Sequence, residues 1–137
     1  MGFDLRAKRR DCEDWSTGAF SWSWMMMEGV GLPIGVYPGD SPGTFIFNER
    51  PDKLCTQYND GARVSAKEAK EMAKIAHLLV AKHRAMKNIW DKLSEQEQEK
   101  RRNCKLISYY IPVRDDFIDK MESFANWAVK SGGFRVW

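Results

Sequence analysis

The residues best suited to chemistry lie in the stretch Phe20–Met27, which reads FSWSWMMM. Trp22 and Trp24 could stack on nucleic-acid bases or grip a protein partner, and methionine side chains adapt to irregular surfaces. The alternation of aromatic residues with serine also fits a strand with one buried aromatic face. We favour this second interpretation, in which the aromatic side chains lie in the core and Met25 or Met27 reaches the surface.

A second candidate is basic. The whole chain carries a net charge of only +3, yet residues 65–105 hold eleven Lys and Arg against six Asp and Glu. Such a segment could contact a nucleic-acid backbone or an acidic protein surface, although a solvated connector explains it equally simply and is the interpretation we favour. The candidate contacts are Lys100, Arg101, Arg102 and Lys105, with Lys82, Arg84, Lys87 and Lys92 beside them.

The segment Gly29–Gly43 is a third candidate because it holds five glycines and three prolines. It contains neither a Walker pattern nor a G-x-G-x-x-G pattern, and Pro33 leaves no room for the helix that a phosphate-binding loop needs. We therefore expect a surface loop, the place where binding residues often lie. Tyr37 and Asp40 are its candidate binding residues.

Evidence for catalysis is weak. His77 and His83 are six residues apart, whereas metal-binding pairs on helices use a spacing of four. Asp60 belongs to an Asn-Asp-Gly turn, in which the aspartate usually satisfies backbone N–H groups. A small hydrolase with a site around Asp4, Asp60 and His77 is thus the least favoured function, and we predict no catalytic residue, metal or cofactor.

The cysteines indicate a compartment. Cys12, Cys55 and Cys104 are odd in number and widely spaced, which argues against a zinc site and a secreted disulfide scaffold. No stretch approaches ~20 apolar residues, so we expect no membrane span. A cytoplasmic protein with reduced thiols fits these observations.

The chain divides into unlike halves of one predicted domain, 1–137. Residues 1–64 are rich in strand and loop signals, with a short apolar start at Phe3–Leu5 and strands expected at Phe20–Met27 and Thr44–Phe47. Residues 65–137 favour helices with one or two short strands, as the following expected elements show. They are a helix from the capping box Ser65–Glu68 to about Leu93, a short helix after Ser94, a strand at Leu106–Ile111, a helix capped by Asp115 and ended by Gly132, and a strand at Phe134–Trp137.

Two long amphipathic helices must bury their apolar faces, and the aromatic strands are their natural partner. We therefore predict an α+β fold, in which a small, mostly antiparallel sheet carries two long helices on one face.

Several short motifs occur in an order that resembles a family of small phage and prophage proteins. The motifs are Met1-Gly2-Phe3-Asp4, Trp22-Ser23-Trp24, Asn59-Asp60-Gly61 before the helix Val64–Ala76, the helix Phe117–Val129, Ser131-Gly132-Gly133-Phe134 and Val136-Trp137. The resemblance implies a phage or prophage accessory protein, located in the host cytoplasm if phage-encoded. Accessory proteins of that origin often bind host factors, including defence complexes.

Two binding functions follow, with different requirements. The first is non-enzymatic binding to a host protein or protein–nucleic-acid complex, which would include inhibition of host defence. It requires an exposed apolar patch and no deep pocket. The alternative is binding of a nucleotide or a single-stranded nucleic acid, which requires an aromatic ring within stacking reach of two or more Lys or Arg.

Overall fold

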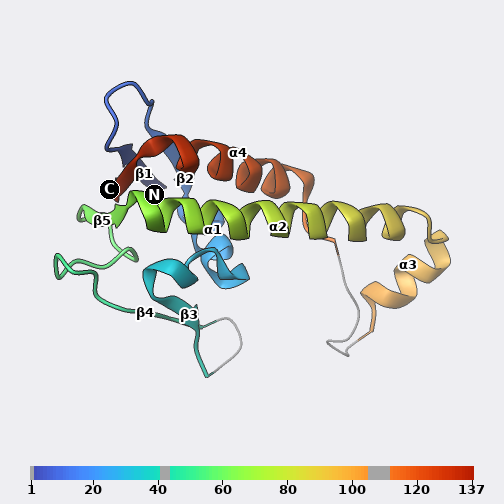
Figure 1. Cartoon of the computed structure of the whole chain (residues 1–137). Helices are drawn as coiled ribbons and strands as arrows, with labels where there is room; N and C mark the ends of the chain where they lie inside the picture. The colour runs from blue at the N-terminus through green and yellow to red at the C-terminus, as the bar shows by residue number, and fades with distance from the viewer. Residues whose placement is uncertain (1, 41–43, 105–111) are drawn as a thin grey trace.

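The computed structural model describes residues 2–40, 44–104 and 112–137, which form a sheet, two long helices and several smaller elements (Figure 1). In chain order the elements are β1 (Gly2–Ala7), β2 (Trp15–Gly18), α1 (Ala19–Met25), the π-helical turn η1 (Met26–Val30), the 3-10 turn η2 (Leu32–Ile34), β3 (Val36–Pro38), β4 (Phe45–Phe47), β5 (Ala62–Ser65), α2 (Ala66–Asp91), α3 (Glu95–Arg102), α4 (Asp115–Ser131) and β6 (Gly133–Val136).

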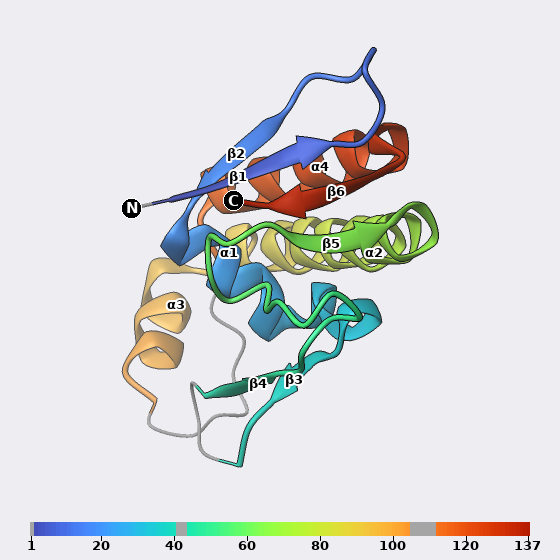
Figure 2. The ribbon, with the colours of Figure 1, turned by 90° about the vertical axis from the view of Figure 1, so that its left-hand side faces the viewer.

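The main sheet joins the two ends of the chain. Its strand order is β2-β1-β6-β5, and every neighbouring pair is antiparallel. Strand β6 therefore lies between β1 and β5, although more than sixty residues separate it from either in sequence. Figure 2 looks onto the sheet with α2 and α4 behind it, so one face is covered and the other is open.

Helices α2 and α4 pack against each other and against the covered face. Helix α2 begins at the predicted capping box, in which Ser65 Oγ accepts from the N–H of Glu68 and the Glu68 carboxylate accepts from the N–H of Ser65. Helix α4 ends at Gly132, whose φ of 70° is the left-handed conformation that favours glycine. The predicted α+β class, with two long helices beside a small antiparallel sheet, is confirmed.

The predicted strand at Phe20–Met27 is wrong, because these residues form α1 and the first part of η1. Consequently the N-terminal half is not built from strands and loops alone. Trp22 is 1% exposed and Met25 is fully buried, whereas Trp24 is 37% exposed. Burial at positions 22, 25 and 26 follows the helical period, so packing against the core overrides the period of two that the Trp-Ser-Trp alternation suggests.

Trp22 packs within the aromatic core. Its ring lies 5.7 Å from that of Phe3 on β1 and 6.3 Å from that of Phe124 on α4. The indole Nε1 donates a hydrogen bond to the backbone carbonyl of Thr56 at 3.2 Å. One side chain thus connects the sheet, α4 and the loop that precedes β5.

The remaining elements agree in part with the sequence-based expectations. Strands β4 and β6 and the short helix α3 lie where they are predicted, but β2 and β5 are too short to give a signal of their own. The strand predicted at Leu106–Ile111 lies outside the described residues. Helix α4 begins at Asp115, and its N-cap is Arg114. The predicted cap at Asp115 is therefore one residue too late.

We expect Trp22→Ala to lower the free energy of unfolding by about 3–5 kcal/mol, because it leaves a cavity among aromatic rings. Urea denaturation followed by circular dichroism would measure this loss. The matched variant is Phe20→Ala, whose parent side chain is 75% exposed on the same helix and should matter little. Equal losses in the two variants would contradict the assignment of Trp22 to the core.

Candidate functional site on the open face of the sheet

The alternation of side chains along each strand places arginines on the open face of the sheet. On β6, Phe134 and Val136 are buried against the helices, while Arg135 between them is exposed. Arg63 on β5 is exposed between buried neighbours in the same way, and Arg6 on β1 is exposed after the buried Leu5. Three of the four strands therefore contribute one arginine each to the same face.

The strand register brings these three arginines into one line. Arg6 pairs with Arg135 across β1 and β6, and Arg63 pairs with Arg135 across β5 and β6. Side chains directly opposite one another on neighbouring strands have their Cβ atoms only about 5 Å apart. We call this line, made of Arg6, Arg135 and Arg63, the arginine row.

The arginine row works against the stability of the sheet. Like charges directly opposite one another on neighbouring strands destabilise a sheet. None of the three guanidinium groups forms an ion pair with another residue of 2–40, 44–104 or 112–137. Asp4 lies on the same face, but in the described part of the chain no carboxylate contacts the guanidinium groups of the row directly.

An aromatic ring lies beside the arginine row. Trp137 follows Arg135 by two residues and lies on the same face, where it pairs with Asp4 through two backbone hydrogen bonds of 2.7 and 2.8 Å. The indole rests on the backbone of Gly61, since a Cβ at Gly61 would lie 2.7 Å from Trp137 Cζ2. The Arg6 guanidinium lies over the indole, with Cζ 4.9 Å from the ring centroid.

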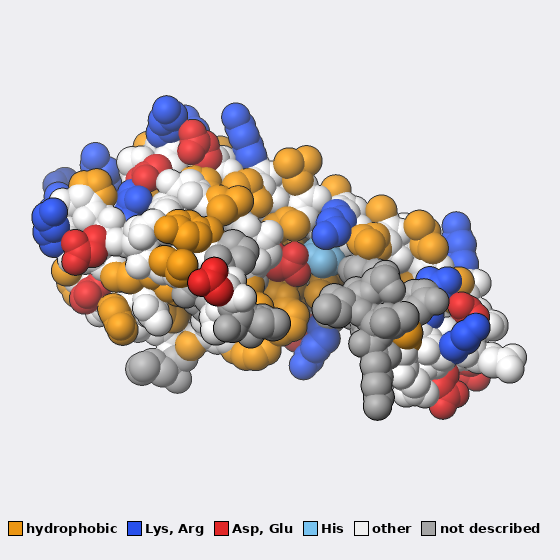
Figure 3. Space-filling model, turned by 90° about the horizontal axis from the view of Figure 1, so that it is seen from below, with side chains coloured by type: hydrophobic (Ala, Val, Ile, Leu, Met, Phe, Trp, Pro, Cys, Tyr) orange, Lys and Arg blue, Asp and Glu red, His pale blue; other side chains and the backbone are white. Residues whose placement is uncertain are grey.

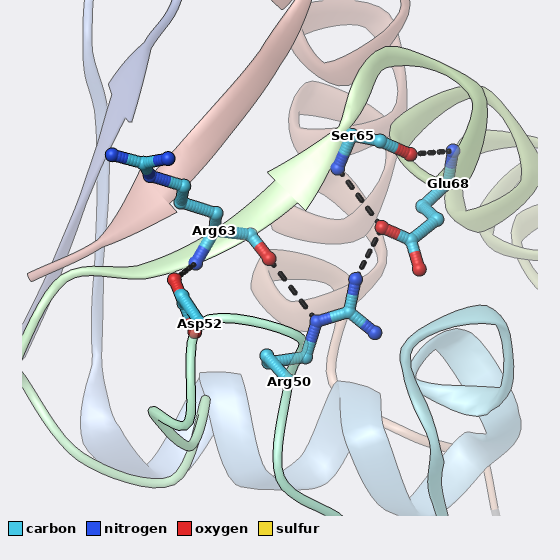
Figure 4. A network of polar contacts seen from close by, with 5 residues as sticks. All are labelled: Arg50, Asp52, Arg63, Ser65 and Glu68. Atoms are coloured by element: carbon cyan, nitrogen blue, oxygen red, sulfur yellow. Dashed lines mark hydrogen bonds and ion pairs between the residues drawn. The ribbon is translucent and has the colours of Figure 1, made fainter.

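The loop before β5 fixes the position of Arg63. Asp52 Oδ2 accepts a hydrogen bond of 2.9 Å from the Arg63 N–H, and Arg50 Nε donates one of 3.1 Å to the Arg63 carbonyl. Figure 4 shows that the Arg63 guanidinium points away from these contacts. Side chains of the loop therefore satisfy the free edge of β5 and leave the Arg63 side chain available on the open face.

Arg50 is itself held by Glu68, with which it forms a partly buried ion pair (Figure 4). Burial acts to raise the pKa of the Glu68 carboxyl, but hydrogen bonds from Arg50 and from the N–H of Ser65 outweigh it and hold the pKa of Glu68 below its ordinary value. Glu68 thus serves both the capping box at the start of α2 and the ion pair with Arg50.

These residues surround a concave region of about 880 Å³. The arginine row and Trp137 line it, Lys8 lies at its β1 side, and Arg50 and Asp52 lie at its β5 side. The cationic groups outnumber the carboxylates there, so the region is suited to an anion. Its combination of guanidinium groups and one indole can bind phosphates and stack on a planar ring.

The structure divides the sequence-predicted binding residues of α1 and η1 between core and surface. Trp22 and Met25 are buried, whereas Trp24 and Met27 are 37% and 40% exposed. With Phe20 they form an apolar stripe at helical spacing, which we call the α1 stripe. The rings of Phe20 and Trp24 lie 5.5 Å apart, and hydrophobic side chains gather on this side of the molecule (Figure 3).

The other predicted binding residues lie away from the arginine row. Tyr37 is on β3, where its hydroxyl accepts a hydrogen bond from Asn48, and Asp40 is exposed after the same strand. Lys100 lies on α3, at the far end of α2 from the sheet (Figure 1). On the same helix, Arg101 pairs with Glu97 and Arg102 lies 5.5 Å over the Trp90 ring, while Lys105 lies outside the described residues.

Basic residues of α2 are engaged with α4. Arg84 forms ion pairs with Asp119 and Glu122, and Lys87 forms one with Asp115. The hydrogen bond to Glu122 raises the pKa of Arg84. These contacts connect the two helices, so the α2 cations add little to a free basic patch.

The groups considered for hydrolysis do not converge. Asp4 lies on the open face of the sheet, whereas His77 is exposed on α2, which covers the opposite face. His83 is buried, with Nε2 3.4 Å from Glu28 Oε1. Within the described ranges, no three His, Cys, Asp or Glu side chains gather closely enough to hold a metal ion. Nor does that part of the chain contain a helix long and apolar enough to cross a membrane.

No protein-family model, curated protein or solved structure matches this chain. The site must therefore be interpreted from its own geometry. Sequence reasoning missed the arginine row, because its members lie at positions 6, 63 and 135 and only the strand register brings them together. The alternation Phe-Arg-Val-Trp at 134–137 is the one local signal that could have pointed to it.

We expect Arg135→Thr to raise the free energy of unfolding by up to about 1 kcal/mol, because it removes the central charge of the row and introduces a residue that favours strands. Urea denaturation at low and high salt would test this, since screening should shrink the gain. Arg10→Thr, in the exposed turn after β1, is the control for net charge. A clear loss of stability in Arg135→Thr would show that the row is not a source of repulsion.

Proposed function

We propose that this chain is a non-enzymatic binding protein whose open sheet face holds a ligand with both phosphate groups and a planar ring, that is, a nucleotide or a nucleic acid. The observation that carries this proposal is the juxtaposition of the arginine row with Trp137. It supports the nucleic-acid alternative through residues that the sequence did not single out, since Arg6 lies over the Trp137 ring and Arg135 lies two residues before Trp137.

The chemistry of the face supports an anionic ligand. Guanidinium groups bind phosphate oxygens through paired N–H donors, and they remain charged at any physiological pH. A bound phosphate would replace repulsion within the row by attraction. The indole of Trp137, fixed by Gly61 and by backbone hydrogen bonds to Asp4, backs the planar Arg6 guanidinium, on which a ring can stack.

We expect ATP, at low salt, to perturb the amide signals of β1, β5 and β6 and the indole N–H signal of Trp137 in a nuclear magnetic resonance titration. Arg135→Gln and Trp137→Leu should each lower the affinity for ATP roughly tenfold, because the first removes one charge-assisted contact and the second removes one stacked ring. Arg114→Gln removes an exposed arginine from the start of α4 and should have no effect. The proposal fails if millimolar ATP and nucleic acid both leave these signals unchanged.

The α1 stripe supports a second function, binding to a protein. Trp22 and Met25 face the core, while Phe20, Trp24 and Met27 are exposed on α1 and η1. A cluster of exposed apolar side chains is typical of a surface that another protein covers. We propose that a host protein or protein complex covers this stripe and is occluded by it. The phage or prophage origin and the inhibition of host defence stay predictions from the resemblance.

In an affinity pull-down from a bacterial host lysate, we expect the tagged protein to bind one host protein in stoichiometric amount. Trp24→Ser should abolish that binding. Trp137→Leu should leave it unchanged, because Trp137 lies on the sheet face. Leu78→Ser is the control for exposed apolar area, since Leu78 is 71% exposed on α2. Equal retention by the wild type and the Trp24 variant would remove the α1 stripe as the binding surface.

A further inference from the structure

We infer that the ligand of the open face is a single-stranded nucleic acid, whose backbone crosses β1, β6 and β5 along the arginine row while one base stacks at Trp137. This inference rests on the proposed nucleotide or nucleic-acid binding and names the ligand class of that same site.

The shape of the row favours a chain of phosphates over one phosphate group. Its three guanidinium groups stand side by side on successive strands, so the row extends across about 10 Å of sheet. A single phosphate can contact neighbouring members of the row but cannot neutralise both ends. Lys8, which lines the same region at the end of β1, adds a further positive charge. Arg50 adds none, because Glu68 neutralises it. A backbone that crosses the strands meets the three guanidinium groups of the row in turn.

The position of Trp137 favours a single strand over a duplex. The Gly61 backbone packs against the indole and the Arg6 guanidinium lies over it, so the surface open to a base is the guanidinium plane backed by the ring. In a duplex both faces of every base are already stacked on neighbouring bases, and this surface would find only base edges. An unpaired base can turn its face to the Arg6 guanidinium above Trp137 while its phosphate stays on the row.

The composition of the face predicts tolerance of sequence. Guanidinium groups act on phosphates, and an indole acts on the face of any base, whereas base identity is read by hydrogen bonds to base edges. The side chains of the row and Trp137 contribute charge and stacking but no amide. Binding should therefore follow length and charge more closely than sequence.

The test is fluorescence anisotropy of a labelled oligothymidylate and a labelled oligouridylate, each of about twelve nucleotides. We expect both to bind more tightly than ATP and more tightly than a duplex of equal length. A plot of log affinity against log salt should have a slope of roughly −2, since three phosphates are neutralised at about −0.7 each. Preference for either sugar would support the inference and identify which nucleic acid is bound.

Two variants separate the roles within the site. Arg135→Gln should reduce the magnitude of the salt slope by about 0.7, because one phosphate contact is lost. Trp137→Leu should weaken binding roughly tenfold with an unchanged slope, because stacking involves no counterion release. Trp137→Phe retains a ring and should recover part of the affinity. Arg114→Gln and Trp24→Leu, which lie off this face, should bind as the wild type does.

The outcomes distinguish this inference from the proposed function. If ATP binds as tightly as the oligonucleotides, the inference is overturned while nucleotide binding stands. Equal binding of the duplex, or loss of binding in Trp24→Leu but not in Trp137→Leu, would also overturn it. If oligoglutamate binds tightly, and binds Trp137→Leu as tightly as the wild type, the ligand of this face is an acidic protein and the inference is overturned. Absence of binding by both ATP and the oligonucleotides would reject the proposed function itself.

Discussion

The insertion of β6 between β1 and β5 is the constraint on which the rest of the structure depends. It requires the chain to leave α4 and turn back at once along the sheet. Gly132 has a φ of 70° and Gly133 a φ of 96°, and a Cβ at Gly133 would lie 2.7 Å from the carbonyl oxygen of Val64. Only glycine fits this close approach to β5, so two adjacent glycines connect the last helix to the central strand.

That connection produces both the core and the open face. Phe134 on β6 faces α4, where its ring lies 6.3 Å from that of Phe124, and Arg135 faces the opposite way. Because side chains alternate along a strand, burial of Phe134 exposes Arg135 on the opposite face. The observed register then sets Arg135 between Arg6 and Arg63. Apolar packing thus selects the face on which Arg135 lies, and the pairing of β6 with β1 and β5 completes the arginine row.

The sequence predicts those parts of the fold that local patterns determine. The two long helices follow from the capping box at Ser65 and from apolar residues at helical spacing, and they dictate the α+β class. Helix α1 was mispredicted, because Trp22 and Trp24 alternate with serine in a way that favours a strand although neighbouring burial follows a helix. Eight residues are too few for periodicity to decide between the two.

The candidate site lies beyond local patterns for a different reason. The row is a property of the pairing between three segments that are distant in sequence, and a charged residue in a short strand looks like any solvated residue. Conversely, the basic segment that the composition does reveal is partly used within the fold, where Arg84 and Lys87 hold α2 to α4. A local excess of charge therefore locates cations without showing which of them remain free for a ligand.

Repulsion within the arginine row also couples ligand binding to folding. Three adjacent guanidinium groups disfavour the sheet when nothing neutralises them, and loop contacts from Asp52 and Arg50 hold β5 in place despite that repulsion. An anion that binds only the folded sheet removes the repulsion and adds its own binding free energy to stability. The α1 stripe is a separate surface of apolar character, so a partner bound there would stabilise the fold by burial instead of by charge. Salt weakens the stabilisation by an anion on the arginine row but not the stabilisation by an apolar partner on the α1 stripe. Ionic strength is therefore the variable that distinguishes the two surfaces.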